Sequence, residues 1–228
     1  MSLRSRRVSA TLSPTLTLFL PPNGNRQDMV DFDKVAVKAV NIATVRERRK
    51  SMDSSQIEQY LDFLGQKLAD MQIKTSIILL GGALMVTQIG NRKATQDIDV
   101  VIATNDRRTY QAVQQAIALV AKEKKLPPAW LNDDVTIVVD QIGKPKAPKH
   151  WKTFGNLTVY VPELEYILAL KLFSGRPQDD RDIRAIAQRL SLQTKVQAWS
   201  IVNKYIPSTQ LGFRNAYTSQ AIDRCFPN

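Results

Sequence analysis

The stretch LLGGALMVTQIGNRKATQDIDVVIA (79–103) constrains the fold of this chain more than any other part of its sequence. It places Gly81 and Gly82 directly after an apolar run, and it sets Asp97 and Asp99 one residue apart at the start of a second apolar run. Because side chains alternate between the two faces of a strand, both carboxylates would share one face, about 7 Å apart at the backbone. Like charges held so close repel each other unless a cation lies between them. The pattern therefore predicts a cation site, and the alternative is a strand end with solvated aspartates.

The kind of ion and ligand follows from the chemistry of the same stretch. Carboxylate oxygens are hard ligands that suit Mg²⁺ or Mn²⁺. Two residues without Cβ let a ligand approach the backbone, and the N–H groups of the helix expected at 83–89 would face an anion. A lone Gly-Gly pair is equally compatible with a plain tight turn, and the stretch is neither a dinucleotide-binding fingerprint nor a P-loop. Combined with the aspartates, it predicts a phosphate-binding turn beside a metal site.

Composition narrows the class of protein. A chain of 228 residues that is 43% hydrophobic can bury one good core, and no apolar run reaches the roughly 20 residues that cross a bilayer. The single cysteine, Cys225, cannot form an internal disulfide, which predicts a reducing, cytoplasmic location. His150 is the single histidine, so neither a His/Cys zinc site nor an H-E-x-x-H site is indicated. The net charge of +11 predicts a polyanionic partner, either nucleic acid or a nucleoside triphosphate.

Three segments follow from composition and periodicity. Residues 1–51 are basic, and residues 1–30 are rich in Ser, Arg, Thr and Pro and lack helical periodicity, so a flexible extension is expected there. Residues 33–50 could form a basic helix within it. Residues 52–190 alternate between helical and strand patterns and form the expected functional domain, whereas 191–228 read as a C-terminal segment of one or two helices. The expected fold is α/β (α+β), a small mixed sheet flanked by helices with a helical C-terminal part. Helices are expected at 52–71, 83–89, 107–124, 163–174 and 179–190, with Pro162 at a first helical position, and strands at 76–80, 97–103, 135–139 and 157–161.

These motifs resemble the nucleotidyltransferase superfamily of polymerase-beta-like fold. The resemblance covers about residues 55–190, and the strings GGALMVTQIGNRKATQDIDVVI and LALKLFSGRPQDDRDI are similar to a bacterial branch that includes AbiEii-type toxins. It implies an enzyme that moves an NMP from an NTP to an acceptor, either tRNA or a protein. It also implies a role as the toxin of a toxin–antitoxin or abortive-infection system, with a cognate antitoxin as partner.

The resemblance also implies roles for individual residues. Gly81 and Gly82 would hold the triphosphate, and Asp97 and Asp99 would bind two metal ions together with a third carboxylate from a later strand. The string WLNDDVTIVVD offers that third acid. Asp133 is favoured because the branch has a similar Trp-Leu-Asn-Asp stretch, and Asp134 and Asp140 are the alternatives.

A second group of candidates surrounds a lysine in an apolar helix face. Lys171 follows Leu164, Ile167 and Leu168 on one face of the helix at 163–174, so it must snorkel to the surface or find an anion. It is expected to reach the nucleotide phosphates or the acidic cluster. The neighbouring residues Asp179 and Asp182, three apart on the next helix, are expected to pair with Lys171 and Arg176 or to act behind the metal ligands, and Asp179 could instead cap its helix. Arg92 and Thr95, just before the aspartates, are expected to contact phosphate or to order their loop.

Two readings compete with transfer. In the first, the fold binds nucleotide or RNA without turnover. In the second, the chain is a basic nucleic-acid-binding protein with structural aspartates and a steeply salt-dependent affinity. The segment 143–156, in which lysines alternate with Trp151 and Phe154, could hold an RNA backbone, but a solvated loop between strands is the plainer expectation.

Overall fold

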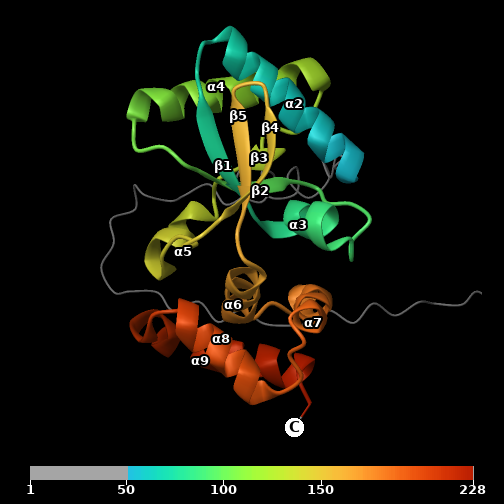
Figure 1. Ribbon diagram of the computed structural model, residues 1–228, viewed down its shortest axis with the longest axis vertical. Helices are drawn as coiled ribbons and strands as arrows, with labels where there is room; N and C mark the ends of the chain where they lie inside the picture. The colour runs from blue at the N-terminus through green and yellow to red at the C-terminus, as the bar shows by residue number, and fades with distance from the viewer. Residues whose placement is uncertain (1–50, 228) are drawn as a thin grey trace, which may run out of the picture. The chain divides into compact units, whose positions relative to one another are not determined.

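The computed structural model describes residues 51–227, and the expectation of a flexible extension at 1–51 lies outside them except for Ser51. The described residues form the expected mixed α/β fold, a sheet flanked by helices (Figure 1). In chain order the elements are α2 (Ser54–Asp70), β1 (Thr75–Leu79), α3 (Gly81–Leu84), η1 (Met85–Ile89), β2 (Ile98–Ile102), α4 (Arg107–Lys124), β3 (Leu131–Asn132), α5 (Thr136–Ile142), β4 (Lys149–Phe154), β5 (Leu157–Val161), α6 (Leu164–Ser174), η2 (Pro177–Asp179), α7 (Asp180–Arg189), α8 (Lys195–Tyr205) and α9 (Ser208–Cys225).

The sheet has the strand order β3-β2-β1-β5-β4. Strand β1 pairs antiparallel with β2 and parallel with β5, and β2 pairs parallel with β3. Strands β1 and β2 are apolar and buried over most of their length, which fits strands covered on both faces. In the short β2–β3 pairing, Asp99 lies opposite Asn132. The register therefore brings an amide next to one of the two aspartates.

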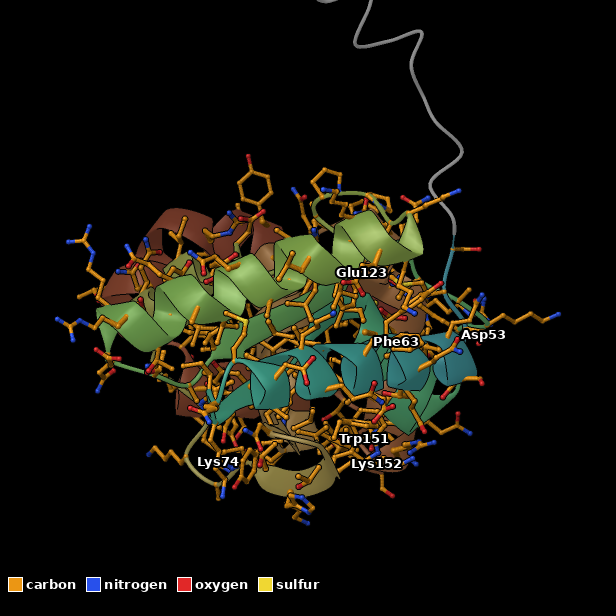
Figure 2. The ribbon with its side chains drawn as sticks, turned by 90° about the horizontal axis from the view of Figure 1, so that it is seen from above. Asp53, Phe63, Lys74, Glu123, Trp151 and Lys152 are labelled. Carbon is orange, nitrogen blue, oxygen red and sulfur yellow. The ribbon has the colours of Figure 1, made fainter. Side chains whose placement is uncertain are left out.

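Helices α2 and α4 lie side by side over the sheet (Figures 1 and 2). A capping box between Asp53 and Gln56 starts α2, which buries Ile57, Leu61 and Leu64 in the core. At the edge of the pair, Lys67 forms an ion pair with Glu123, and the ammonium of Lys124 lies 3.3 Å from the centroid of the Phe63 ring. The apolar faces of both helices thus close one side of the core, while their charged residues face outward.

Helices α6 to α9 gather beyond the end of β5 (Figure 1). Helix α6 is buried on nearly all sides because α7, α8 and α9 pack against it. At its C-terminus Gly175 has a φ of +68°, and a Cβ there would lie 2.7 Å from the Cβ of Tyr217 in α9. The described part of the predicted C-terminal helical segment, 191–227, contains α8 and α9, and both helices pack against α6.

The prediction of a strand at 135–139 was wrong. This stretch begins a helix, α5, which buries Val139 and Ile142 on one side and leaves Ile137 exposed. β-branched residues favour strands only where a neighbouring strand and a pleated surface are available. Here β3 ends at Asn132, and a hydrogen bond from Thr136 N–H to the Asp133 carbonyl turns the chain into the helix.

Other parts of the prediction also differ from the structure. Met52 does not begin a helix: it forms an isolated antiparallel bridge with Thr95, and α2 starts two residues later. Helix α6 starts at Leu164 with Glu163 as its N-cap, so Pro162 precedes the helix. The expected loop at 143–156 contains the edge strand β4, whose backbone pairs with β5. Trp151 and Lys152 of this strand lie at the margin of the molecule in Figure 2.

Within residues 51–227, no helix combines the length and apolarity needed to span a membrane.

Candidate active site

The glycine pair lies directly against an aspartate. Gly81 has a φ of +58°, and a Cβ on it would lie 1.8 Å from Oδ2 of Asp99. The segment that follows β1 is already helical at Gly81, two residues earlier than the sequence suggested, and the Gly82 N–H acts to lower the pKa of Asp99. A Cβ on Gly82 would lie 2.3 Å from the hydroxyl oxygen of Thr95. Only residues without a side chain allow the turn, the aspartate and Thr95 to approach so closely.

Asp97 and Asp99 form an acidic pair at the start of β2. Asp97 directly precedes the strand and Asp99 is its second residue, and both side chains are half-buried. Burial raises the pKa of Asp99, and the charge of Asp97 raises it further. A side-chain hydrogen bond from Asn132, the charge of Arg176 and the Gly82 N–H oppose that rise in the pKa of Asp99. A second positive charge beside the pair would therefore favour the ionised form.

The structure separates the three candidates for a third carboxylate. Asp133 turns to α4, where it accepts hydrogen bonds from the Tyr110 hydroxyl (2.9 Å) and from the Gln114 amide (3.3 Å). Asp140 is exposed on α5. Asp134 lines the same cavity as Asp99, although its side chain is largely exposed. Asn132, which the sequence analysis did not single out, occupies the position beside Asp99. Within residues 51–227, no cluster of three or more His, Cys, Asp or Glu residues could hold a metal ion.

Two cavities meet at this pair, and they share Gly81, Asp99, Lys171 and Arg176. The first, here called the polar cavity, has a volume of about 820 Å³ and lies over the glycine turn and the loop before β2. It is lined by Gly81, Gly82, Arg92, Lys93, Ala94, Thr95, Gln96, Asp97, Asp99, Lys171, Arg176, Gln178, Asp179 and Arg181. The second, here called the apolar cavity, has a volume of about 430 Å³ and lies between α5 and α6. It is lined by Leu80, Gly81, Asp99, Asp134, Val135, Val138, Ile167, Leu170, Lys171, Phe173, Ser174, Arg176 and Arg214.

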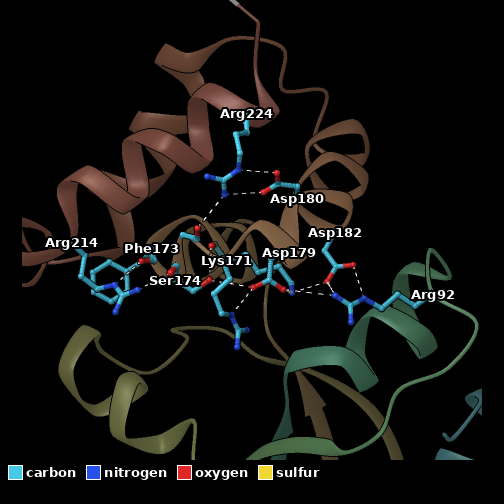
Figure 3. A network of polar contacts seen from close by, with 11 residues as sticks. Arg92, Lys171, Phe173, Ser174, Asp179, Asp180, Asp182, Arg214 and Arg224 are labelled. Carbon is cyan, nitrogen blue, oxygen red and sulfur yellow. Dashed lines mark hydrogen bonds and ion pairs between the residues drawn. The ribbon is translucent and has the colours of Figure 1, made fainter. Parts of the chain in front are cut away.

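Lys171 is buried between two aspartates (Figure 3). Its ammonium lies 2.7 Å from an oxygen of Asp179 and 2.7 Å from an oxygen of Asp182. Burial disfavours ionisation of both acids, but nearby cations outweigh it. Lys171 and Arg176 hold the pKa of Asp179 below its usual value, and Arg92 and Lys171 do the same for the pKa of Asp182. Lys171 thus reaches the cavity wall as part of a balanced ionic cluster, and Asp179 uses its side chain for that cluster and makes no capping bond on α7.

Two arginines connect this cluster to the polar cavity. Arg92 donates from Nε (2.8 Å) and Nη2 (2.5 Å) to the two oxygens of Asp182, in a bidentate pair. Arg176 donates from Nε to Asp179 (3.0 Å), while its side chain remains 60% exposed at the cavity wall. Thr95 is held by its backbone bridge to Met52, and its hydroxyl packs closely against Gly82. Arg92 and Thr95 therefore order the wall of the cavity, and Arg176 presents charge to its interior.

Sequence reasoning missed two residues of this site. Asn132 follows the buried Trp130, whose indole N–H donates to the Ile117 carbonyl, and only the strand register shows that it adjoins Asp99. Arg214 comes from α9, in the predicted C-terminal helical segment. Its position between Gly212 and Asn215 carries no periodic or spacing signal. Strand pairing places Asn132 beside Asp99, and packing of the C-terminal helix places Arg214 at the apolar cavity.

The fold and the site define a nucleotidyltransferase-like protein: a mixed sheet carries an acidic pair at a strand start, opposite a glycine turn and beside a cavity with a basic wall. The family model described as "Nucleotidyltransferase of unknown function (DUF6036)" matches residues 56–211. The chain belongs to this family. Comparison with curated proteins and with solved structures gave no significant match.

Proposed function

We propose that this protein is a metal-dependent nucleotidyltransferase that transfers an NMP from an NTP to an acceptor hydroxyl. The observation that carries the proposal is the approach of Gly81 to Asp99, where a Cβ would lie only 1.8 Å from the carboxylate. Gly81 and Asp99 both line the two cavities, and Asp97 lines the polar cavity. Family membership supports the same reaction class.

The chemistry of the donor set fits Mg²⁺ or Mn²⁺. Mg²⁺ is commonly bound by one or two carboxylates together with water and substrate phosphates. Asp97 and Asp99 provide two carboxylates, and burial together with the charge of Asp97 raises the pKa of Asp99. Bound there, the ion would supply Lewis-acid polarisation of the phosphoryl oxygens and a more acidic acceptor hydroxyl.

The residues of the chain then have separate tasks. Gly81 and Gly82 would allow the triphosphate to approach the backbone, and Arg176, Arg181 and Lys93 would neutralise its charge in the polar cavity. The acceptor oxygen forms a bond to the α-phosphorus as the bond from that phosphorus to the bridging oxygen breaks. Pyrophosphate leaves, and the acceptor proton passes to the nearby carboxylates or to water.

The acceptor and the cellular role rest on resemblance to AbiEii-type toxins. That resemblance makes tRNA or a protein the acceptor to test first. It also makes the toxin of a toxin–antitoxin or abortive-infection system, with a cognate antitoxin, the first role to test.

The test is transfer of label from α-labelled NTPs in the presence of Mg²⁺ and either total tRNA or cell lysate. Labelled product is expected with the wild-type protein, and a loss of at least 100-fold is expected for Asp97→Asn combined with Asp99→Asn, because removing groups that stabilise developing charge costs about this much or more. Asp70→Asn, an exposed acid at the end of α2, is the matched control and should retain the rate. Absence of transfer, or transfer that survives the double substitution, would refute the proposal.

Two further substitutions test which residue lies beside the acidic pair as the third ligand of the metal. Asp133→Asn is expected to change transfer by less than about threefold, because its carboxylate is held by Tyr110 and Gln114. Asn132→Ala is expected to lower it, since the bond from Asn132 to Asp99 would be lost. The opposite ranking would restore Asp133 as the third ligand.

A second candidate function is nucleotide binding without transfer. The observation that favours it is that an amide, Asn132, and not a carboxylate, pairs with Asp99 across β2 and β3. Mg²⁺-dependent binding of ATP or GTP, together with an absence of transfer to any acceptor, would support this candidate over the first.

A further inference from the structure

The apolar cavity differs in chemistry from the polar cavity that it adjoins. Leu80, Val135, Val138, Ile167, Leu170 and Phe173 give it aliphatic and aromatic walls, and its volume of about 430 Å³ falls in the range of small-molecule sites. A triphosphate gains little from such walls. A flat, mostly apolar ring system of moderate size would bury its faces there.

Arg214 is the cationic group that α9 contributes to this cavity. Figure 3 shows it beside Phe173 and Ser174. Its guanidinium lies 5.4 Å from the centroid of the Phe173 ring and 5.5 Å from that of Tyr217. It donates from Nε to the Phe173 carbonyl (3.0 Å) and from Nη2 to the Ser174 carbonyl (2.7 Å), at the C-terminal end of α6. Backbone acceptors and ring stacking therefore fix the plane of the guanidinium.

The fixed guanidinium retains N–H groups for a ligand. An arginine has five N–H donors and no acceptor, and the two carbonyls account for two of the five. The side chain is half-buried and forms no ion pair with any described acid. Its positive charge is therefore not neutralised by a carboxylate, whereas that of Lys171 is. Arg214 also lies beyond residues 56–211, the part of the chain that the family model matches.

We infer that the apolar cavity is the subsite for the nucleobase, and that Arg214 is the residue that determines base specificity. The inference rests on the proposed function for the position of the triphosphate in the polar cavity. The two cavities share Gly81 and Asp99, so a nucleotide whose α-phosphate lies at Asp99 places its base in one cavity and its β- and γ-phosphates in the other. The apolar walls cover the faces of the base, and Arg214 contacts its edge.

The donor-only chemistry of Arg214 predicts which bases bind. Guanine and uracil present a carbonyl oxygen where adenine and cytosine present an amino group. A guanidinium donates to the carbonyl and repels the amino hydrogens. The preferred substrates are therefore the keto-base nucleotides, GTP and UTP, over ATP and CTP, and guanine can accept at both O6 and N7.

The experiment measures binding to the full chain by calorimetry in Mg²⁺, so that it does not depend on transfer. The ligands are α,β-methylene analogues of GTP, UTP, ATP and CTP, and inorganic tripolyphosphate, which has no base. Wild-type protein is expected to bind the GTP and UTP analogues about tenfold more tightly than the other two. Arg214→Met, which keeps the side-chain stem, should abolish this preference and leave tripolyphosphate affinity within about twofold.

A second variant and a control guard against loss of folding. Val138→Phe adds bulk to the apolar cavity from α5 and should weaken all four analogues at least tenfold without affecting tripolyphosphate. Arg184→Met is the control, because Arg184 also connects to α9 by donating to a backbone carbonyl, that of Arg224, but does so on the exposed side. It should bind every ligand as the wild type does.

The outcomes separate this inference from the proposed function. If the wild type binds neither analogues nor tripolyphosphate, the proposed function fails and the base subsite fails with it. If the wild type binds them but shows no keto preference, or if Arg214→Met weakens tripolyphosphate as much as GTP, the inference is overturned while nucleotide binding stands. Unchanged analogue binding in Arg214→Met with a raised KM for the acceptor would instead assign the apolar cavity to the acceptor.

Discussion

Gly81 carries the closest approach in the site, and its conformation excludes other residues. Its φ is +58°, a region that costs residues with a Cβ roughly 1 kcal/mol or more. In addition, a Cβ would overlap the Asp99 carboxylate at 1.8 Å, so the aspartate would have to move. The position therefore couples backbone conformation to the geometry of the acidic pair.

Gly81→Ala is expected to lower Mg²⁺-dependent affinity for an NTP analogue at least tenfold, because the new methyl group displaces Asp99. Calorimetric titration and thermal unfolding measure the two effects. Gly90→Ala is the matched control: Gly90 also has a positive φ (+69°), but a Cβ there meets no described atom within 4 Å. It should lose about 1 kcal/mol of stability from backbone strain alone and retain its affinity. Equal affinities in the two variants would show that contact with Asp99 does not matter.

Between elements, α2 and β4 approach most closely at another glycine. A Cβ on Gly65 would lie 1.8 Å from the carbonyl oxygen of Phe154, and the Gly65 carbonyl accepts from the Asn156 N–H. The helix therefore packs directly onto the backbone of the β4–β5 hairpin. This contact is one reason that the lysine-rich segment before β5 forms an ordered edge strand.

Gly65→Ala is expected to destabilise the fold by about 2 kcal/mol, because overpacking against rigid backbone costs 1–3 kcal/mol. Gly212→Ala in α9 is the matched helical control, since a Cβ there meets no described atom within 4 Å. The gain in helix propensity should make it neutral or up to about 1 kcal/mol more stable. Urea unfolding measures both, and a stable Gly65→Ala protein would show that α2 can shift away from the hairpin.

Across the whole of the described unit, the cluster of Lys171, Asp179, Asp182 and Arg92 joins the loop before β2 to α6 and α7. Both acids have a lowered pKa in the folded protein, with burial opposed by their cationic partners. Their contribution to stability is therefore present above the unfolded pKa, about 3.9, and is lost as the pH falls through the lower folded pKa. Acid should thus separate the helices from the sheet.

The free energy of unfolding should fall steeply below about pH 4 in the wild type and less steeply in Asp179→Asn combined with Asp182→Asn. Urea unfolding at a series of pH values from 7 to 2.5 measures both curves. The double variant should also be less stable at pH 7, because Lys171 would be buried without an anion. Parallel curves below pH 4 would show that these two acids do not govern acid stability.

Local patterns in the sequence determined the parts of this protein that depend on nearby residues. Strand-period alternation and helical spacing predicted β5 and α4 with their observed bounds, and Gly90 and Gly175 were correctly expected to end helices. The turn at Gly81 and Gly82 was predicted to lie beside the acidic pair Asp97 and Asp99, and a Cβ on Gly81 would indeed lie 1.8 Å from Asp99. These features follow from backbone sterics and side-chain periodicity, which act over a few residues.

Only the tertiary structure decided what depends on packing between distant segments. The β-branched stretch after Asn132 forms α5, because β3 ends at Asn132 and the Thr136 N–H bonds to the Asp133 carbonyl. Strand register, and not sequence spacing, set Asn132 beside Asp99 and turned Asp133 away to α4. Packing of α9 on α6 brought Arg214 to the apolar cavity. These placements depend on contacts between segments far apart in the chain, and no local stretch of sequence contains that information.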